Sequence, residues 1–145
     1  MKKIAIVASK FNIEITEKLL AGALLAWDDQ QDKSINPKTF WVPGAVEIPL
    51  ITKKLLQRYD AVICLGCVIQ GETKHFDYVC NMVSQGCMQL SLESQKPVIF
   101  GVLTTTDRLQ ALERAGGAKG NKGFDSMLAA IDMLNTMDII DEKDS

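Results

Sequence analysis

The chain has 145 residues, of which 47% are hydrophobic and 23% charged, and its formal net charge is −2. This balance excludes a disordered chain and argues against a nucleic-acid-binding surface. The length suits one domain over residues 1–145. The longest apolar runs, such as IAIVA and AVICLG, are too short to span a membrane or to form a signal peptide. We therefore expect a cytoplasmic protein.

Four apolar runs bounded by turn residues predict strands that are buried on both faces: Lys3 to Ala8, Thr39 to Val42, Ala61 to Ile69 and Val98 to Leu103. Between and after them lie segments with helical spacing: Ile13 to Trp27, Pro49 to Arg58, about Lys74 to Leu92, Asp107 to Ala115 and Lys122 to Ile140. Strands that alternate with helices predict parallel crossovers. The expected fold is an α/β three-layer sandwich, with a four-stranded, mainly parallel, flavodoxin-like sheet flanked by helices.

Two of the four cysteines, Cys64 and Cys67, have the spacing of a metal or redox motif. Residues three apart on a strand point to opposite faces, so these two thiols cannot bind one ion together. We expect Cys64, Cys67, Cys80 and Cys87 to be buried structural thiols and no metal to be bound. A thiol or metal protein is the alternative.

Polar segments follow all four predicted strands, namely KFN, PGAVEIP, QGETKH and TTTD. In parallel sheets ligands bind beyond the carboxyl ends of the strands. Glu47 could accept hydrogen bonds from a diol or amine, or it could complement the dipole of the following helix. Phe11 could stack on a ligand, or it could be a buried aromatic beside a helix-capping Asn12. The residues alone leave both choices open.

The only histidine, His75, follows the turn GETK. Gly71 permits a sharp turn and Thr73 can cap the helix that follows. Lys74 and His75 then lie where the helix dipole disfavours cations. That placement suits a bound phosphate, or an imidazole that acts in its neutral form, although a structural histidine is the competing interpretation.

Two basic residues, Arg114 and Lys122, flank the segment AGGAKGN. The helix that starts near Asp107 would carry Arg114 roughly 10 Å from the strand ends, toward the opposite edge of its own sheet. The pair forms either a solvated basic turn at a helix C-terminus or an anion grip that completes a neighbouring subunit's site.

The ordered segments KFN, VPGAVEIP, LGCVIQGETKHFDYV, PVIFGVLTTTDRLQALERAG and GNKG resemble the lumazine synthase family, the 6,7-dimethyl-8-ribityllumazine synthases of riboflavin biosynthesis. The resemblance spans nearly the whole chain. It implies a transferase that joins 5-amino-6-(D-ribitylamino)uracil to 3,4-dihydroxy-2-butanone 4-phosphate and releases phosphate and water. It also implies that no metal or organic cofactor takes part.

The resemblance further implies roles for individual residues. The residues expected to hold the ribitylaminouracil are Phe11, which stacks on the pyrimidine, then Ala45, Val46, Glu47, Cys67, Val68 and Ile69, and Phe100 from the adjacent subunit. The groups expected at the phosphate substrate are the amides of Glu72 and Thr73, with Arg114 and Lys122 from the adjacent subunit. His75 matches the proton-transfer residue of the family.

The chain also departs from the family. Lys10 and Gln70 stand where many relatives carry arginine, and Val46 where an aromatic is common, so ring and ribityl contacts are expected to differ in detail. Many members have an extra strand ahead of the first core strand that pairs with a neighbour, and we expect that contact to be missing here.

Small-molecule substrates and a homo-oligomer are the partners that the resemblance implies, with riboflavin synthase as a further one. Members form pentamers, and in some lineages twelve pentamers close into a sixty-subunit shell. The loop GGAKGNKG lacks the insertion associated with pentamer-only members, which is compatible with the shell. The missing strand argues against the shell, so the two observations conflict. Two alternatives are an archaeal-type riboflavin synthase, which dismutates two lumazines, and a flavodoxin-like module that binds flavin or lumazine without turnover.

Overall fold

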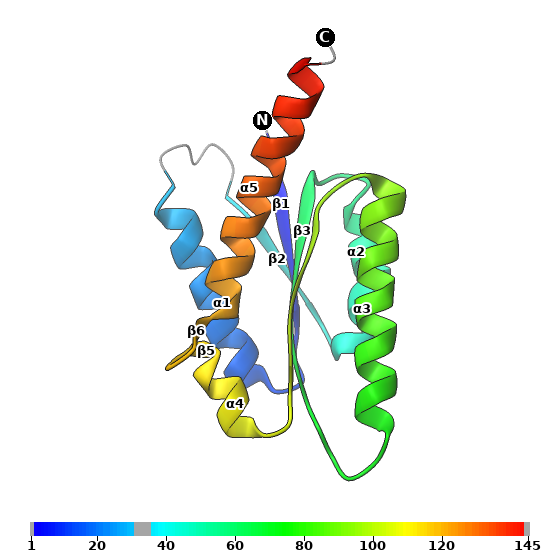
Figure 1. The fold of residues 1–145 in the computed structure, drawn as a ribbon, viewed down its shortest axis with the longest axis vertical. Helices are drawn as coiled ribbons and strands as arrows, with labels where there is room; N and C mark the ends of the chain where they lie inside the picture. The colour runs from blue at the N-terminus through cyan, green and yellow to red at the C-terminus, as the bar shows by residue number, and fades with distance from the viewer. Residues whose placement is uncertain (1, 31–35, 144–145) are drawn as a thin grey trace.

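The computed structural model describes residues 2–30 and 36–143 (Figure 1). One parallel sheet has the strand order β2-β1-β3-β4. Its strands are β1 (Ile4–Ser9), β2 (Lys38–Val42), β3 (Ala61–Ile69) and β4 (Val98–Thr105). The helices are α1 (Ile13–Asp28), α2 (Ile48–Leu55), α3 (His75–Ser94), α4 (Arg108–Glu113) and α5 (Lys122–Lys143). The predicted α/β order and parallel sheet are confirmed.

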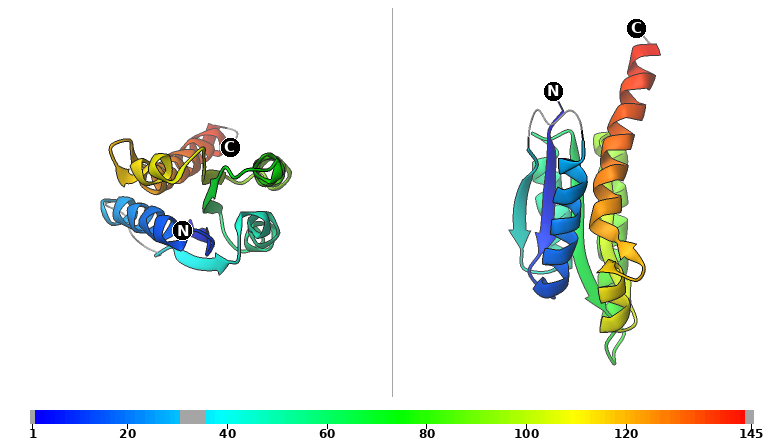
Figure 2. Two further views of the ribbon diagram at one scale, coloured as in Figure 1. Left: turned by 90° about the horizontal axis from the view of Figure 1, so that it is seen from below. Right: turned by 90° about the vertical axis from the view of Figure 1, so that its left-hand side faces the viewer.

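Helices cover both faces of the sheet, with α1 and α5 on one face and α2 and α3 on the other (Figures 1 and 2). Alternation along β1 divides its side chains between the two layers. Ile4 and Ile6 join the cluster under α1 and α5, whereas Ala5 and Val7 join the cluster under α2 and α3. The chain therefore has two hydrophobic cores, one on each side of the sheet.

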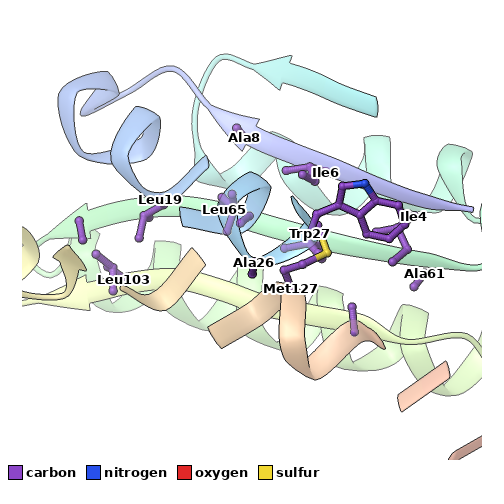
Figure 3. Packing of buried hydrophobic residues seen from close by; sticks show 14 of the residues in the cluster. Ile4, Ile6, Ala8, Leu19, Ala26, Trp27, Ala61, Leu65, Leu103 and Met127 are labelled. Atoms are coloured by element: carbon purple, nitrogen blue, oxygen red, sulfur yellow. The ribbon is translucent and has the colours of Figure 1, made fainter. Parts of the chain in front are cut away.

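The helical spacing predicted for α1 is confirmed, because Ile15, Leu19 and Ala23 are fully buried and Trp27 is nearly so. Figure 3 shows Leu19 and Trp27 in one cluster with Leu65 of β3 and Met127 of α5. Each large apolar side chain buried in this way contributes about 1.5–3 kcal/mol. Across the described ranges, no helix is both long and apolar enough to span a bilayer.

The prediction that all four strands are buried on both faces is wrong for β2. β1 is buried along its whole length, but in β2 the side chains of Lys38 and Trp41 are exposed and only Val42 is buried. The reason is position, since β2 and β4 are the edges of the sheet and the flanking helices cover its centre more fully. β4 is accordingly only half-buried over its first three residues.

Two small elements were not predicted. A 3-10 helix, η1 (Ala45–Glu47), precedes α2, and a hairpin of β5 (Ala115–Gly117) and β6 (Gly120–Asn121) precedes α5. The hairpin needs a left-handed backbone at Gly116 and Gly120, whose φ angles are 106° and 82°. The glycines of AGGAKGN indicated a break between helices, but they did not reveal that its two sides pair.

The start of α5 is fixed against α1 by a close backbone approach. A Cβ at Gly123 would overlap the carbonyl oxygen of Leu19, and one at Gly22 would overlap the Asn121 side chain. The Asn121 side chain donates to the Lys18 carbonyl at 3.0 Å and accepts from the Gly123 amide at 2.8 Å. The first turn of α5, which carries Lys122, is thus held at a defined place.

Candidate functional site

Most of the predicted site residues fall into two cavities that share no lining residue, whereas Glu47 and Glu72 line neither. One cavity, of about 400 Å³, is called the aromatic cavity here and is lined by Phe11, Gly44, Ala45, Val46, Cys67, Val68, Ile69, Gly71, Thr73, His75, Phe76 and Val79. The other, of about 620 Å³, is called the cationic cavity and is lined by Phe100, Val102, Leu103, Thr104, Thr105, Gln110, Arg114, Lys119, Lys122 and Asp125.

The loop after β1 carries Phe11, whose side chain is 70% exposed. The alternative of a buried aromatic is therefore wrong. The amides of Lys10 and Phe11 donate to the carbonyls of Val42 and Pro43 at 2.8 and 3.0 Å. These bonds tie the loop after β1 to the loop after β2, so that Phe11 lies beside Ala45 and Val46 in the aromatic cavity.

Asn12 stands at the N-cap position of α1 but its side chain does not cap the helix. Its Nδ2 instead donates to the carbonyl oxygen of Cys67 at 2.9 Å. The capping role considered for Asn12 is therefore wrong, and the amide links the β1–α1 loop to the end of β3. No local signal in the sequence identifies this link, because the two residues are 55 positions apart.

Glu47 neither lines the aromatic cavity nor caps α2 with its side chain. Its Oε1 accepts a hydrogen bond from the amide of Gly44 at 2.9 Å, which closes the 3-10 turn on itself. Only one carboxylate oxygen is used by this bond, and Glu47 is half-buried. The other oxygen has lone pairs for a donor that arrives at this edge of the sheet.

The end of β3 forms the wall of the aromatic cavity through Cys67, Val68 and Ile69. Cys67 is buried, and burial raises the pKa of its thiol from 9.0 to about 11, with nearby Arg108 opposing the shift. The thiol is therefore neutral near pH 7 and acts as apolar surface. Val68 and Ile69 are half-buried and remain accessible to a ligand.

The turn before α3 differs slightly from the expectation. The helix begins at His75 with Lys74 at the N-cap, and the Thr73 hydroxyl accepts from the His75 amide at 3.3 Å. Thr73 was expected to be the N-cap residue of α3. It stands one residue before the actual N-cap, Lys74, and contributes only a long hydrogen bond. Glu72, Thr73 and His75 are all exposed, and only Thr73 and His75 of these line the aromatic cavity. The exposed turn leaves the N-terminal end of α3 accessible to an anion.

The hairpin β5–β6 brings Arg114 and Lys122 together in the cationic cavity. The Lys122 amide donates to the Arg114 carbonyl at 2.8 Å, and the Arg114 guanidinium donates to the Gln110 carbonyl at 3.0 Å. Arg114 is half-buried and Lys122 exposed, and neither makes an ion pair within the described residues. Lys119 adds a third cation that sequence reasoning did not select.

Helix α4, which has Arg114 as its C-cap residue, is anchored at its start. Asp107 caps it by accepting the Gln110 amide at 2.8 Å, and the Gln110 side chain accepts from the amide and hydroxyl of Thr106 at 2.9 and 2.8 Å. Arg108 forms an ion pair with Glu14 of α1. The short helix is therefore fixed between β4 and α1, and so is the backbone that presents Arg114.

The thiols occupy both cores, as expected for structural cysteines. Cys64 belongs to the cluster under α2 and α3, whereas Cys67 belongs to the cluster under α1 and α5, so the two point to opposite faces. The contact with Cys87 at 3.9 Å, together with burial, raises the pKa of Cys64 well above its ordinary value. Cys80 is half-buried rather than buried, which corrects that part of the prediction. Within residues 2–30 and 36–143 no group of side chains has the composition of a metal site.

Comparison with known proteins gives consistent matches. A protein-family model described as 6,7-dimethyl-8-ribityllumazine synthase matches residues 1–138. Two proteins named 6,7-dimethyl-8-ribityllumazine synthase, from Coxiella burnetii strains Dugway 5J108-111 and CbuG_Q212, are 52% and 53% identical over 144 residues. The alignments cover 98% of this chain and 95% of each relative.

Proposed function

Because the chain belongs to the 6,7-dimethyl-8-ribityllumazine synthase family, we propose that it is a transferase that condenses 5-amino-6-(D-ribitylamino)uracil with 3,4-dihydroxy-2-butanone 4-phosphate. The products are 6,7-dimethyl-8-ribityllumazine, phosphate and water. The reaction belongs to riboflavin biosynthesis, and the product is the substrate of riboflavin synthase, which we propose as a partner. Family membership also supports a cytoplasmic location.

The main support for the proposed site is that the ring-binding residues and the phosphate-binding cations line two different cavities. The aromatic cavity holds the stacking ring and the imidazole, and the cationic cavity holds Arg114 and Lys122. A condensation of an aromatic amine with a phosphorylated ketone needs both kinds of group at one place. We propose that the aromatic cavity of one subunit and the cationic cavity of its neighbour form each site.

The exposed face of α3 supports an assembly. Four large apolar side chains of this helix are more than half exposed in the single chain: Tyr78 at 66%, Met82 at 55%, Met88 at 61% and Leu92 at 71%. A row of this kind on one helix is typical of a surface that a protein partner covers. We propose that the family's oligomer is here a pentamer, and that twelve pentamers form a closed shell.

In the proposed site the pyrimidine stacks on Phe11 and lies against the wall of Cys67, Val68 and Ile69. Ala45, Val46 and Glu47 hold the ring and the ribityl chain, with the free oxygen of Glu47 as an acceptor and Phe100 contributed by the neighbour. The amides of Glu72 and Thr73 bind the phosphate group together with the neighbour's Arg114 and Lys122.

The chemistry then follows from positioning and proton transfer. The substrate amine attacks the ketone carbonyl, and the oxygen leaves as water to give an imine. Loss of a proton from the adjacent carbon and departure of phosphate follow, and the second nitrogen closes the ring with loss of water. His75 accepts and returns these protons. Arg114 and Lys122 stabilise the phosphate as its bond to carbon breaks. Holding both substrates in register supplies much of the acceleration.

The test mixes the purified protein with both substrates and follows lumazine absorbance together with inorganic phosphate. The expected result is equal formation of lumazine and phosphate at a rate well above the spontaneous reaction. Product at the spontaneous rate would refute the proposed function. Turnover of lumazine alone, without phosphate release, would indicate a riboflavin synthase, and ligand binding without any turnover would indicate a binding module.

A further inference from the structure

One residue of the β1–α1 loop, Asn12, combines a strained backbone with a side-chain bond to another strand. Its φ and ψ angles are 58° and 43°, in the left-handed region. Within the described residues, Asn12 and Gln95 are the only residues other than glycine with a positive φ. Asparagine tolerates this region better than most residues, so the backbone alone already restricts what can stand at this position.

The side chain of Asn12 forms a hydrogen bond to β3 beyond the last residue pair that β3 forms with β1. The pairing of β3 with β1 ends at Leu65, opposite Ala8, whereas β3 continues to Ile69 against β4. Ser9, the last residue of β1, still lies beside Gly66, and one residue further along β3 the Nδ2 of Asn12 donates to the Cys67 carbonyl at 2.9 Å. The amide thus extends the β1–β3 connection by one hydrogen bond.

This bond connects two walls of the aromatic cavity. Phe11 precedes Asn12 and is 70% exposed, so packing within the chain does not hold its ring. The backbone must therefore fix the ring, through the Phe11 bond to Pro43 on one side and the Asn12 bond to Cys67 on the other. The carbonyl of Cys67 belongs to the wall of Cys67, Val68 and Ile69 that faces the same cavity.

We propose that Asn12 is a positioning residue that sets the separation between the Phe11 ring and the Cys67–Ile69 wall, and so determines affinity for the planar pyrimidine substrate. The inference rests on the proposed function. An aromatic plate and an opposing wall bind a planar ring only when their separation matches its thickness. In this proposal Asn12 acts through its hydrogen bond to the Cys67 carbonyl and not on the reacting atoms.

The test compares Asn12→Gly and Asn12→Asp with the wild-type assembled enzyme. Glycine keeps the left-handed backbone and removes the donor, whereas aspartate keeps the shape and places an acceptor against the Cys67 carbonyl. For Asn12→Gly we expect the Kd of the pyrimidine, titrated alone by fluorescence, and its KM to rise about three- to tenfold, as for one lost neutral hydrogen bond. Asn12→Asp should weaken binding further, while kcat and the KM of the phosphate substrate change less in both variants.

Gln95→Gly is the matched control, because Gln95 has a φ of 55° at the C-terminal end of α3 and lines neither cavity. It should leave both KM values unchanged. Thermal unfolding of each variant shows that the fold persists. Wild-type pyrimidine affinity in Asn12→Gly, or a fall in kcat with KM unchanged, would overturn the positioning role. If wild-type enzyme itself makes no lumazine, the proposed function fails instead, and the titration of the pyrimidine alone still tests Asn12.

Discussion

The two cavities differ in what surrounds them and in how they are built. The aromatic cavity is formed by loops after three strands and by the start of α3, and its walls are mostly apolar. The cationic cavity is formed by β4, α4, the hairpin and α5, and it presents Arg114, Lys119 and Lys122. One cavity suits a planar ring, and the other suits an anion.

This difference is the basis of the proposal that two chains share each site. The aromatic cavity contains the histidine but no arginine or lysine, and the cationic cavity contains three cations but no histidine. Each cavity is rigidly built by hydrogen bonds inside its own chain. In the proposed shared site, catalysis depends on how two copies meet, and the following experiments test that dependence.

The largest effect is expected for Arg114→Ala. Loss of a charged donor to phosphate should reduce kcat/KM for the phosphate substrate about 10³-fold, since bidentate charge-assisted hydrogen bonds are removed. Initial rates at low concentrations of that substrate measure it. Arg58→Ala, an exposed arginine outside both cavities, is the control and should keep the wild-type rate. A loss confined to the pyrimidine KM would contradict the assignment.

Mixed assembly tests whether the cavities of two subunits combine. His75→Ala and Arg114→Ala chains, unfolded together and reassembled in equal amounts, should regain about a quarter of the wild-type rate, because that share of interfaces pairs two intact cavities. Separately reassembled samples mixed afterwards provide the control. Activity equal to the mean of the two parents would show that each site lies within one chain.

A smaller effect is expected for His75→Ala. Turnover should fall about tenfold without being abolished, because positioning supplies much of the acceleration and water can replace the imidazole. Steady-state kcat with both substrates saturating measures the effect. The KM of the phosphate substrate should change little, in contrast to Arg114→Ala. A greater loss in His75→Ala than in Arg114→Ala would reverse the roles proposed for the two cavities.

The smallest effect concerns the burial of the Cys67 thiol in the core under α1 and α5. Burial raises the pKa of Cys67 to about 11, so the unfolded chain releases this proton at lower pH than the folded chain. The contribution of this thiol to the free energy of unfolding is therefore fully present below pH 9. It falls by about 2 kcal/mol as the pH rises from 9 to 11. Urea unfolding at several pH values should show this loss in wild type and not in Cys67→Ser. Equal pH dependence in both proteins would mean that water reaches the thiol.

The sequence predicted the fold well because its signals are local. The apolar runs of β1 and β3 and the spacing of Ile15, Leu19 and Trp27 each report burial directly. The parallel direction of the strands also follows from the alternation of strands and helices, whereas their order in the sheet does not. The burial of β2 was overestimated because a run of apolar residues does not reveal whether its strand has one neighbour or two.

The candidate site was predictable only in part. Phe11, His75 and Arg114 are conspicuous as residue types after strands or helices, and each lines a cavity. The role of Asn12 depends on β3 outlasting β1 by four residues, which no local pattern encodes. Glu47 was expected to face a ligand, but its bond to Gly44 arises from a 3-10 turn whose geometry the sequence does not specify.

The open edge of β2 has a consequence for assembly. An unpaired strand edge can recruit a strand from any other chain, and so it is a common start of aggregation. Here the edge is only five residues long and begins with the exposed charge of Lys38. Both features discourage growth of the sheet from one molecule to the next. The exposed apolar face of α3 can therefore direct association in a chain that carries little risk of polymerising through β2.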